Sequence, residues 1–173
     1  MTYASPIVSS IDGAAINTNG ISKQTLQGSN FGAVCTGCVS ATYGGDSGTK
    51  YGPVECDVVL AHESLVCDTV PGVGRGHRWK VTRDSLTSQL SSGASNYLAP
   101  SIDSDGLSGD AMAVLGSDTR GGASITIRGA NFGPDGNANV VVTYGPDGAL
   151  NPYTAASCAV TGGGHDTITC STV

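Results

Sequence analysis

Six cysteines are the residues of this sequence whose chemistry is easiest to infer from spacing. Cys56 and Cys67 bracket one strand–turn–strand pattern, and Cys158 and Cys170 bracket another with nearly the same separation. This matched spacing favours two equivalent disulfides, each closing a loop of about a dozen residues and stabilising its domain by roughly 3 kcal/mol. Full pairing of an even number of cysteines would indicate an oxidising compartment.

Cys35 and Cys38, in the segment CTGC, leave three alternatives open. The first is a local disulfide, which we expect. The second is a thioredoxin-like redox pair, although the sequence lacks the βαβ context of that motif. The third is a zinc site shared with Cys56 and Cys67, although the matched spacing assigns those two cysteines to each other.

Two histidine–acid pairs could act as general bases, His62 with Glu63 and His165 with Asp166. Each histidine lies five residues before a cysteine, and this duplicated position indicates a duplicated turn rather than catalysis. The sequence contains no nucleophile elbow, no phosphate-binding loop and no HExxH motif. We therefore expect a protein without enzymatic activity and without a cofactor.

The segment DSDGLSGD places Asp103, Asp105 and Asp110 close together, and carboxylate oxygens are ligands for Ca²⁺. The segment lacks the glycine at the sixth position of an EF-hand loop. We expect a solvated loop with no metal, and a calcium site is the alternative.

The segment GRGHRWKVTR carries four of the eight basic residues. Strand alternation points Trp79 inward and its charged neighbours outward. This pattern predicts an edge strand that is kept soluble by charge. The alternative is a binding face for an acidic polysaccharide or a neighbouring subunit. The four basic residues are Arg75, Arg78, Lys80 and Arg83.

All of these residues belong to a sequence that repeats once. A shift of 101 superposes Gly28 on Gly129 and the segment VSATYG on VVVTYG. Shifts of 102 and 103 superpose the later tyrosine, cysteine and histidine positions, and Tyr3 and Tyr97 each lie three residues before a proline. All six tyrosines, both phenylalanines and four of the six cysteines pair between the copies, so the chain contains two copies of one module.

Each module contains a Gly-x-Asn-Phe-Gly turn, which we interpret as a structural corner. Glycine supplies positive φ, asparagine tolerates it, and the phenylalanine should fill the end of the core. The corner residues are Asn30, Phe31 and Gly32 in the first module and Asn131, Phe132 and Gly133 in the second.

Short β-branched runs between glycine-rich turns predict strands and little helix. Six or seven strands in fewer than 100 residues predict an all-β protein made of small sandwiches. The expected strands are 7–11, 23–27, 39–43, 56–59, 65–67 and the segment HRWKVT in the first module, with matches near 102 and at 124–128, 140–144, 158–160 and 168–170.

The motifs ITIRGANFG, TYG and HDTITCST of the second module, like TLQGSNFG and LVCDTVPGVG of the first, resemble the IPT/TIG family of immunoglobulin-like domains. The segments CDTVPGVGRGHRWKV and NYLAPSI are most similar to tandem TIG arrays on secreted and surface proteins of protists and algae. The resemblance covers nearly the whole chain and implies two tandem immunoglobulin-like sandwiches, residues 1–97 and 98–173.

The second sandwich should lack its last strand, because Cys170 is followed by only three residues whereas Cys67 is followed by the segment with Trp79. We expect either a fragment of a longer array or a module completed by a strand from a neighbour.

The family resemblance implies a non-enzymatic structural or interaction module of an extracellular filament, matrix or cell-surface protein. Its partners would be neighbouring repeats or subunits, or a polysaccharide. The alternative is a ligand- or carbohydrate-binding ectodomain fragment of a receptor or secreted enzyme. The net charge of −6 argues against nucleic acid as a partner, and no apolar run approaches the roughly 18 residues of a membrane span.

Overall fold

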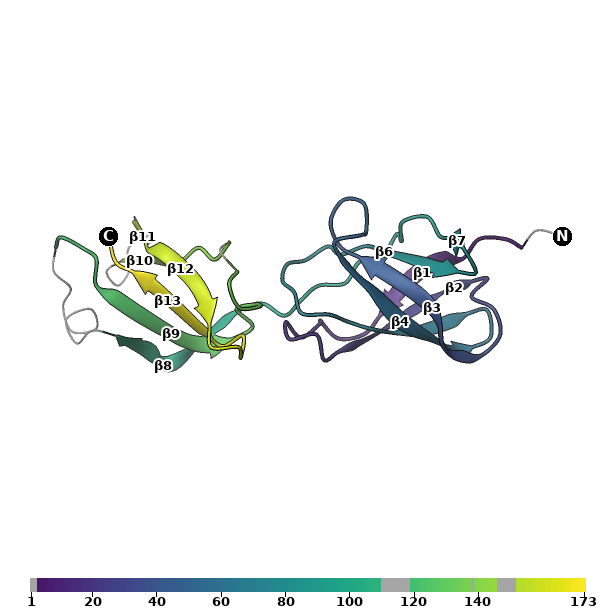
Figure 1. The fold of residues 1–173 in the computed structure, drawn as a ribbon, viewed down its shortest axis with the longest axis horizontal. Helices are drawn as coiled ribbons and strands as arrows, with labels where there is room; N and C mark the ends of the chain where they lie inside the picture. Colours follow the sequence, from purple (N-terminus) through teal and green to yellow (C-terminus); the bar gives the residue numbers. More distant parts are fainter. Residues whose placement is uncertain (1–2, 110–118, 138, 146–151) are drawn as a thin grey trace. The chain divides into compact units, whose positions relative to one another are not determined.

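The computed structural model describes residues 3–109, 119–137, 139–145 and 152–173. The chain divides into two compact units, Met1–Leu98 (unit 1) and Ala99–Val173 (unit 2), shown in Figure 1. Every regular element in the described ranges is a β-strand, and all the strand pairs of the sheets are antiparallel. The all-β, sandwich-like prediction is therefore confirmed.

Unit 1 contains one seven-stranded sheet in the order β1-β2-β5-β4-β3-β6-β7. The first strand of the sheet, β1, contacts β6, which lies next to the last strand, so that the sheet folds over its own core as a sandwich. The strands are β1 (Ile7–Asp12), β2 (Lys23–Ser29), β3 (Cys35–Tyr43), β4 (Tyr51–Leu60), β5 (Ser64–Asp68), β6 (Trp79–Arg83) and β7 (Leu86–Thr87).

The core of unit 1 follows from strand alternation, because every second side chain of a strand points to the same face. In β4 the buried positions are Val54, Cys56 and Val58, and in β6 they are Trp79 and Val81. These side chains pack against the buried residues of β2, β3 and β5 and against Phe31.

Unit 2 contains a four-stranded sheet in the order β12-β13-β9-β8 and a separate two-stranded pair of β10 and β11. Its smaller core consists of Ile125, Ile127, Phe132, Val160, Ile168 and Cys170. The strands are β8 (Ser101–Gly109), β9 (Ser124–Ala130), β10 (Thr143–Tyr144), β11 (Tyr153–Thr154), β12 (Ala156–Thr161) and β13 (Thr167–Ser171).

The strand predicted over 140–144 is shorter than expected, because only Thr143–Tyr144 is a strand. In unit 1 the matching strand β3 is hydrogen-bonded on both sides, by β4 and by β6. Among the described residues of unit 2, β10 pairs only with β11. The preceding residues therefore lack the two flanking ladders that hold β3 extended, and Val141 is 75% exposed.

Both modules build the same corner from the same residues. Asn30 and Asn131 have φ angles of 65° and 61°, which lie in the left-handed region. A Cβ on Gly28 would collide with the carbonyl oxygen of Ile7 and lie 2.6 Å from the ring of Phe31. In unit 2 a Cβ on Gly129 would collide with the carbonyl oxygen of Ser101 and lie 2.7 Å from the ring of Phe132. The glycine therefore lets the first strand of each module cross close over the corner.

Candidate interaction surfaces

The histidine–acid pairs lie in turns whose backbone holds the two corners. His62 and His165 both have positive φ, 64° and 61°. The backbone N–H of Phe31 donates to the carbonyl oxygen of His62 at 3.3 Å, and Phe132 donates to His165 in the same way at 2.8 Å. The backbone N–H groups of Gly28 and Gly129 likewise donate to the backbone carbonyl oxygen of the acidic residue that follows each histidine, at 2.9 Å in both modules. These residues are duplicated because their backbone carbonyl oxygens hold the corner in both modules.

Three disulfides account for all six cysteines. Cys56–Cys67 joins β4 to β5 at positions directly opposite each other in the ladder, and Cys158–Cys170 joins β12 to β13. Three of these four cysteines are buried among core side chains, and Cys158 is partly buried against the same core. The third disulfide, Cys35–Cys38, lies within the first residues of β3 and is partly exposed. The first two are the pairs that the matched spacing favours, and the third is the local disulfide expected among the three alternatives for Cys35 and Cys38.

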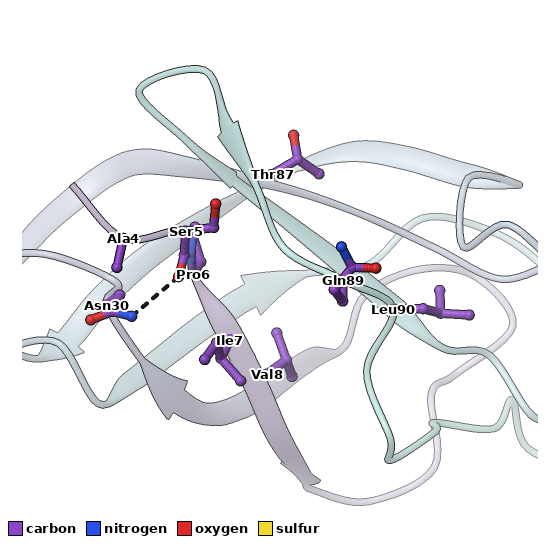
Figure 2. Close-up of a pocket in the computed structure, with 9 residues that line it drawn as sticks. All are labelled: Ala4, Ser5, Pro6, Ile7, Val8, Asn30, Thr87, Gln89 and Leu90. Atoms are coloured by element: carbon purple, nitrogen blue, oxygen red, sulfur yellow. Dashed lines mark hydrogen bonds between the residues drawn. The ribbon is translucent and has the colours of Figure 1, made fainter. Parts of the chain in front are cut away.

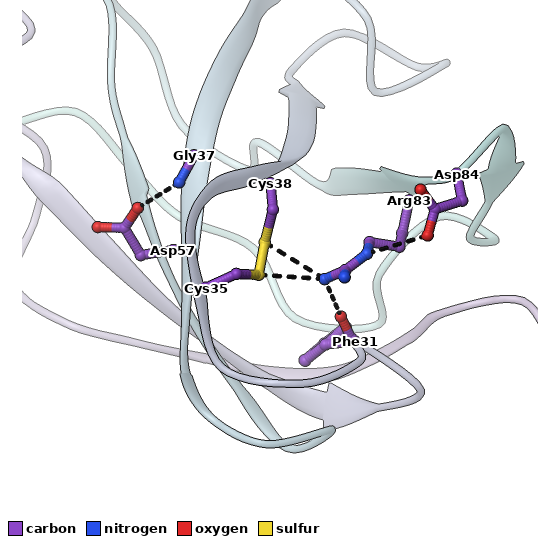
Figure 3. Close-up of a disulfide and its surroundings, with 7 residues drawn as sticks. All are labelled: Phe31, Cys35, Gly37, Cys38, Asp57, Arg83 and Asp84. Carbon is purple, nitrogen blue, oxygen red and sulfur yellow. Dashed lines mark hydrogen bonds and ion pairs between the residues drawn. A yellow bond between two sulfur atoms is a disulfide. The ribbon is translucent and has the colours of Figure 1, made fainter.

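Arg83, one of the four basic residues of the alternative binding face, lies against the Cys35–Cys38 disulfide (Figure 3). Strand alternation places it on the same side of β6 as Trp79 and Val81. Its Nη1 donates to the carbonyl oxygen of Phe31 at 2.9 Å and lies 3.2 and 3.3 Å from the sulfurs of Cys35 and Cys38. Its Nε donates to Asp84 at 3.2 Å. The long arginine side chain reaches back over the corner because the corner carbonyl offers it an acceptor.

The prediction of an edge strand at HRWKVT is wrong, because β6 lies between β3 and β7 in the sheet. The short strand β7 takes up part of the outer ladder of β6, and Ser88 and Ser91 continue it by donating their N–H groups to Val81 and Trp79. Of the basic residues, Arg75 and Arg78 are exposed and Lys80 is partly buried. The inward positions of Trp79 and Val81 agree with strand alternation.

The acidic segment predicted as a loop is part of strand β8, which pairs with β9 as far as Gly109. Asp103 and Asp105 are exposed on this strand, and Asp110 lies outside the described residues. Within the described ranges, no three histidine, cysteine or acidic side chains are grouped to hold a metal ion. Residues on both sides of the acidic segment pair with β9, and the register shifts between Ile102 and Leu107, so Asp103 and Asp105 lie in the irregular part of the strand.

One cluster of rings was missed at the level of sequence, and it closes the end of unit 1 opposite the corner. We call Tyr43, Tyr51, His77, Trp79 and Tyr97 the aromatic cluster. Tyr43 stacks on Trp79 with ring centroids 4.2 Å apart, and Tyr97 makes edge contacts with Tyr51 and His77 at 5.5 and 5.3 Å. The pairing of all six tyrosines between the repeats was the signal that could have indicated it.

Tyr97 is the last buried residue of unit 1 and is held by hydroxyl and backbone bonds. Its hydroxyl lies 2.8 Å from the hydroxyl of Tyr43 and donates to the carbonyl oxygen of Val70 at 2.7 Å. Its backbone N–H donates to the carbonyl oxygen of Gly74, and the N–H of Leu98 donates to the carbonyl oxygen of Ile16 at 2.8 Å. Burial raises the pKa of the Tyr97 hydroxyl well above its usual value, so it stays neutral.

His77 should make the stability of unit 1 sensitive to acid. Its side chain is buried, and its Nε2 has no hydrogen-bond partner among the described residues. Burial lowers the pKa of His77 below its usual value near 6.5. The unfolded state therefore binds a proton more readily than the folded state, and stability is lost as the pH falls below about 6.5.

We expect the free energy of unfolding of unit 1 to decrease between pH 7 and pH 5, and to decrease less in His77→Phe. Phenylalanine keeps a ring in the cluster but does not titrate. Urea unfolding at each pH, followed by the fluorescence of Trp79, measures this, because the chain has a single tryptophan. Equal pH dependence in the two proteins would contradict the prediction.

Unit 2 contains the counterpart of two of the five rings of the aromatic cluster. The rings of Tyr144 and Tyr153 lie 5.5 Å apart at 32°, compared with 5.2 Å and 36° for Tyr43 and Tyr51. The Tyr144 hydroxyl accepts from the N–H of Val173 at 2.9 Å and donates to its carbonyl oxygen at 3.0 Å. Tyr43 accepts from the N–H of Val70 at the same distance. Tyr153, however, is 50% exposed.

The segment that precedes β1 lies along the surface of unit 1 near the corner. The Asn30 side chain donates from Nδ2 to the carbonyl oxygen of Ser5 at 3.1 Å, as Figure 2 shows. A cavity of about 440 Å³ lies beside this segment, between Pro6 and Leu90. A second cavity, of about 490 Å³, is lined by Tyr3, Asn30 and Arg83 among others. The corner asparagine thus also positions the segment that enters the module.

No protein-family model matches the chain, and no curated protein matches it. Among solved structures, the chain is similar to the full extracellular region of plexin A4, with 21% sequence identity and a TM-score of 0.39. That match covers 97% of this chain and 15% of the plexin chain, so this chain spans a small part of its length. The described residues contain no helix long and apolar enough to cross a membrane. The likeness to IPT/TIG domains remains a prediction from the motifs.

Proposed function

We propose that this chain is a non-enzymatic structural module of an extracellular filament, matrix or cell-surface protein. The observation that carries the proposal is the anchoring of Tyr97. The segment by which the chain leaves unit 1 is fixed in the aromatic cluster by its ring, its hydroxyl and its backbone. A module whose exit segment belongs to its own core is suited to connect repeats in series.

The three disulfides support a place outside the cytosol. Disulfides persist in oxidising compartments, and small domains with limited cores depend on them. Unit 2 has the smaller core, and its disulfide closes a loop between two neighbouring strands of the sheet. The stabilisation of each unit by a covalent link fits a protein that must stay folded in an extracellular environment.

The use of the reactive residue types supports a structural role. His62 and His165 lie in turns that hold the corners, and the cysteines are paired. His77 is enclosed by rings, and Arg83 ties the corner to a disulfide. Each of these residues therefore has a role in holding the fold together.

Immunogold electron microscopy with antibodies against this chain tests the proposal. On intact cells of the source organism, we expect label on extracellular filaments, matrix or the cell surface. Antibody absorbed beforehand with the purified chain is the control and should leave the same cells unlabelled. Label that appears only after permeabilisation, over the cytoplasm or nucleus, would overturn the proposal.

A further inference from the structure

The Cys35–Cys38 disulfide differs from the other two in its surroundings. It joins cysteines three residues apart, and both of them are partly exposed. The other two disulfides, Cys56–Cys67 and Cys158–Cys170, pack against core side chains, and we call them the core disulfides. Three of their four cysteines are at most 3% exposed. Because thiol–disulfide exchange depends on access to the sulfur, the Cys35–Cys38 disulfide is the one open to attack in the folded protein.

This disulfide closes an irregular stretch of β3 and not a regular part of the sheet. The register between β3 and β4 shifts between Cys35 and Val39. Within this stretch, the backbone N–H of Gly37 donates to the side chain of Asp57 at 2.8 Å, as Figure 3 shows. The regular ladder resumes at Val39, beyond both cysteines. The disulfide can therefore open while the rest of β3 stays paired.

Arg83 supplies a positive charge to both sulfurs. Its Nη1 lies 3.2 Å from the Sγ of Cys35 and 3.3 Å from the Sγ of Cys38. A guanidinium is always charged in proteins, and a cation beside a cysteine favours the thiolate over the thiol. Exchange is faster when the departing sulfur is the more stable thiolate. The carbonyl oxygen of Phe31 and the carboxylate of Asp84 also accept from this guanidinium, so it is held in place when the disulfide opens.

A cavity of about 520 Å³ lies beside Cys38, which is one of the residues that line it. The charged side chains of its lining are those of Glu55 and Asp84, and both are acidic. The cavity gives a small thiol an approach to Cys38, and its acidic lining suits a thiol that carries a positive charge.

We propose that Cys38 is a site of reversible exchange with an external thiol, which leaves a mixed disulfide on Cys38 and a thiolate on Cys35 beside Arg83. The thiol first loses its proton to solvent. Its sulfur then forms a bond to the Sγ of Cys38, the bond between the two Sγ atoms breaks, and the electron pair of that bond stays on Cys35. The incoming sulfur is oxidised and the sulfur of Cys35 is reduced, so the step needs no further oxidant or reductant.

The reverse step restores the original disulfide. The thiolate of Cys35 attacks the Sγ of Cys38, and the external thiol leaves. This inference goes beyond the proposed function, because a disulfide that only stabilises a module has no need of an exchange partner. It assigns to unit 1 a place where a thiol-bearing molecule is attached and released.

Cysteamine, a small thiol with a positive charge, is the probe for this site. The folded full chain is exposed to it briefly, free thiols are trapped with N-ethylmaleimide, and peptide mapping by mass spectrometry locates both adducts. We expect cysteamine on Cys38 and the maleimide on Cys35. The core disulfides should react at least about tenfold more slowly, because their sulfurs become accessible only when the core opens.

Substitutions of Arg83 separate its charge from its packing. Arg83→Gln should react with cysteamine at least about threefold more slowly than the wild type, because it removes the cation that stabilises the departing thiolate. Arg83→Lys keeps the charge and should react faster than Arg83→Gln. Arg78→Gln is the matched control, since Arg78 is exposed and precedes β6, and it should react as the wild type does. Trp79 fluorescence checks that unit 1 stays folded in each variant.

Three results would overturn the proposal. The first is a reaction of the core disulfides as fast as that of the Cys35–Cys38 disulfide. The second is cysteamine found mainly on Cys35, which would reverse the roles of the two sulfurs. The third is a folded Arg83→Gln variant that reacts as fast as the wild type or faster, because a guanidinium that only shields the sulfurs would expose them when it is removed. The position of the adduct in the wild type tests the proposal even where a variant fails to fold.

Discussion

Replacing Phe31 with alanine is expected to lower the free energy of unfolding of unit 1 by about 3–5 kcal/mol. The side chain of Phe31 is fully buried, and its ring fills the space directly beneath Gly28. The corner backbone is fixed by the left-handed conformation of Asn30 and by the bond to His62, so the cavity cannot collapse easily. Urea unfolding followed by Trp79 fluorescence measures the change, because the single tryptophan reports on unit 1.

Phe132→Ala provides the internal comparison, because Phe132 occupies the same corner in unit 2. It should destabilise unit 2 by a similar amount, measured by hydrogen exchange of the amides of β9 and β13. The unfolding transition reported by Trp79 should stay where it is in the wild type. A loss below about 1 kcal/mol in both variants would mean that the corner rings are not core residues.

Trp79→Ala is expected to cost unit 1 about 3–5 kcal/mol as well. The side chain of Trp79 is fully buried and stacks on Tyr43, and its Nε1 donates to the hydroxyl of Ser95 at 2.9 Å. Truncation removes the largest fully buried side chain of the structure and leaves Ser95 without its donor. Thermal unfolding monitored by far-ultraviolet circular dichroism replaces fluorescence here, because the variant lacks tryptophan.

Trp79→Phe separates the two contributions of this side chain. It keeps a ring against Tyr43 but loses the donor to Ser95, so it should destabilise unit 1 less than Trp79→Ala does. If the alanine variant unfolds at the same temperature as the wild type, Trp79 is not needed to close the core, and its stacking on Tyr43 does not contribute to the stability of unit 1.

The repeat explains why most of the fold could be predicted from sequence. The spacing of the cysteines and the Asn-Phe-Gly motif depend on local geometry, and each appears twice with the same surroundings. The strands at 23–27 and 124–128 were predicted nearly in full, since both extend two residues further to Ser29 and Ala130. Patterns of this kind depend on residues close in sequence, and their recurrence in the second copy supports the interpretation made for the first.

The details that differ depend on neighbours that are distant in sequence. The acidic segment lies within strand β8 because β9 pairs with the residues on both sides of it, and β10 is short because no second ladder flanks it among the described residues. Arg83 continues the inward alternation of Trp79 and Val81, but its partner is the carbonyl oxygen of Phe31, some fifty residues earlier. Charge and alternation alone give no information on such partners.

The aromatic cluster was missed for a related reason. Its five rings come from four separate segments, and Tyr97 joins them only because the chain returns beside Ile16 after completing the sheet. The repeat paired Tyr97 with Tyr3, which indicated a recurring role without showing what that role is. A buried exit residue becomes visible only when the path of the chain is known.

Tension along the chain would enter unit 1 on its C-terminal side through Leu98 and Tyr97, because the chain leaves the unit there. To extract this segment, the bonds to Ile16 and Gly74 and both hydroxyl contacts of Tyr97 must be broken while its ring leaves the rings of Tyr51 and His77. Forced unfolding is governed by the height of the unfolding barrier rather than by equilibrium stability. Tyr97 is thus a mechanical latch, and Tyr97→Phe should let unit 1 yield at lower force than the wild type in a single-molecule pulling experiment.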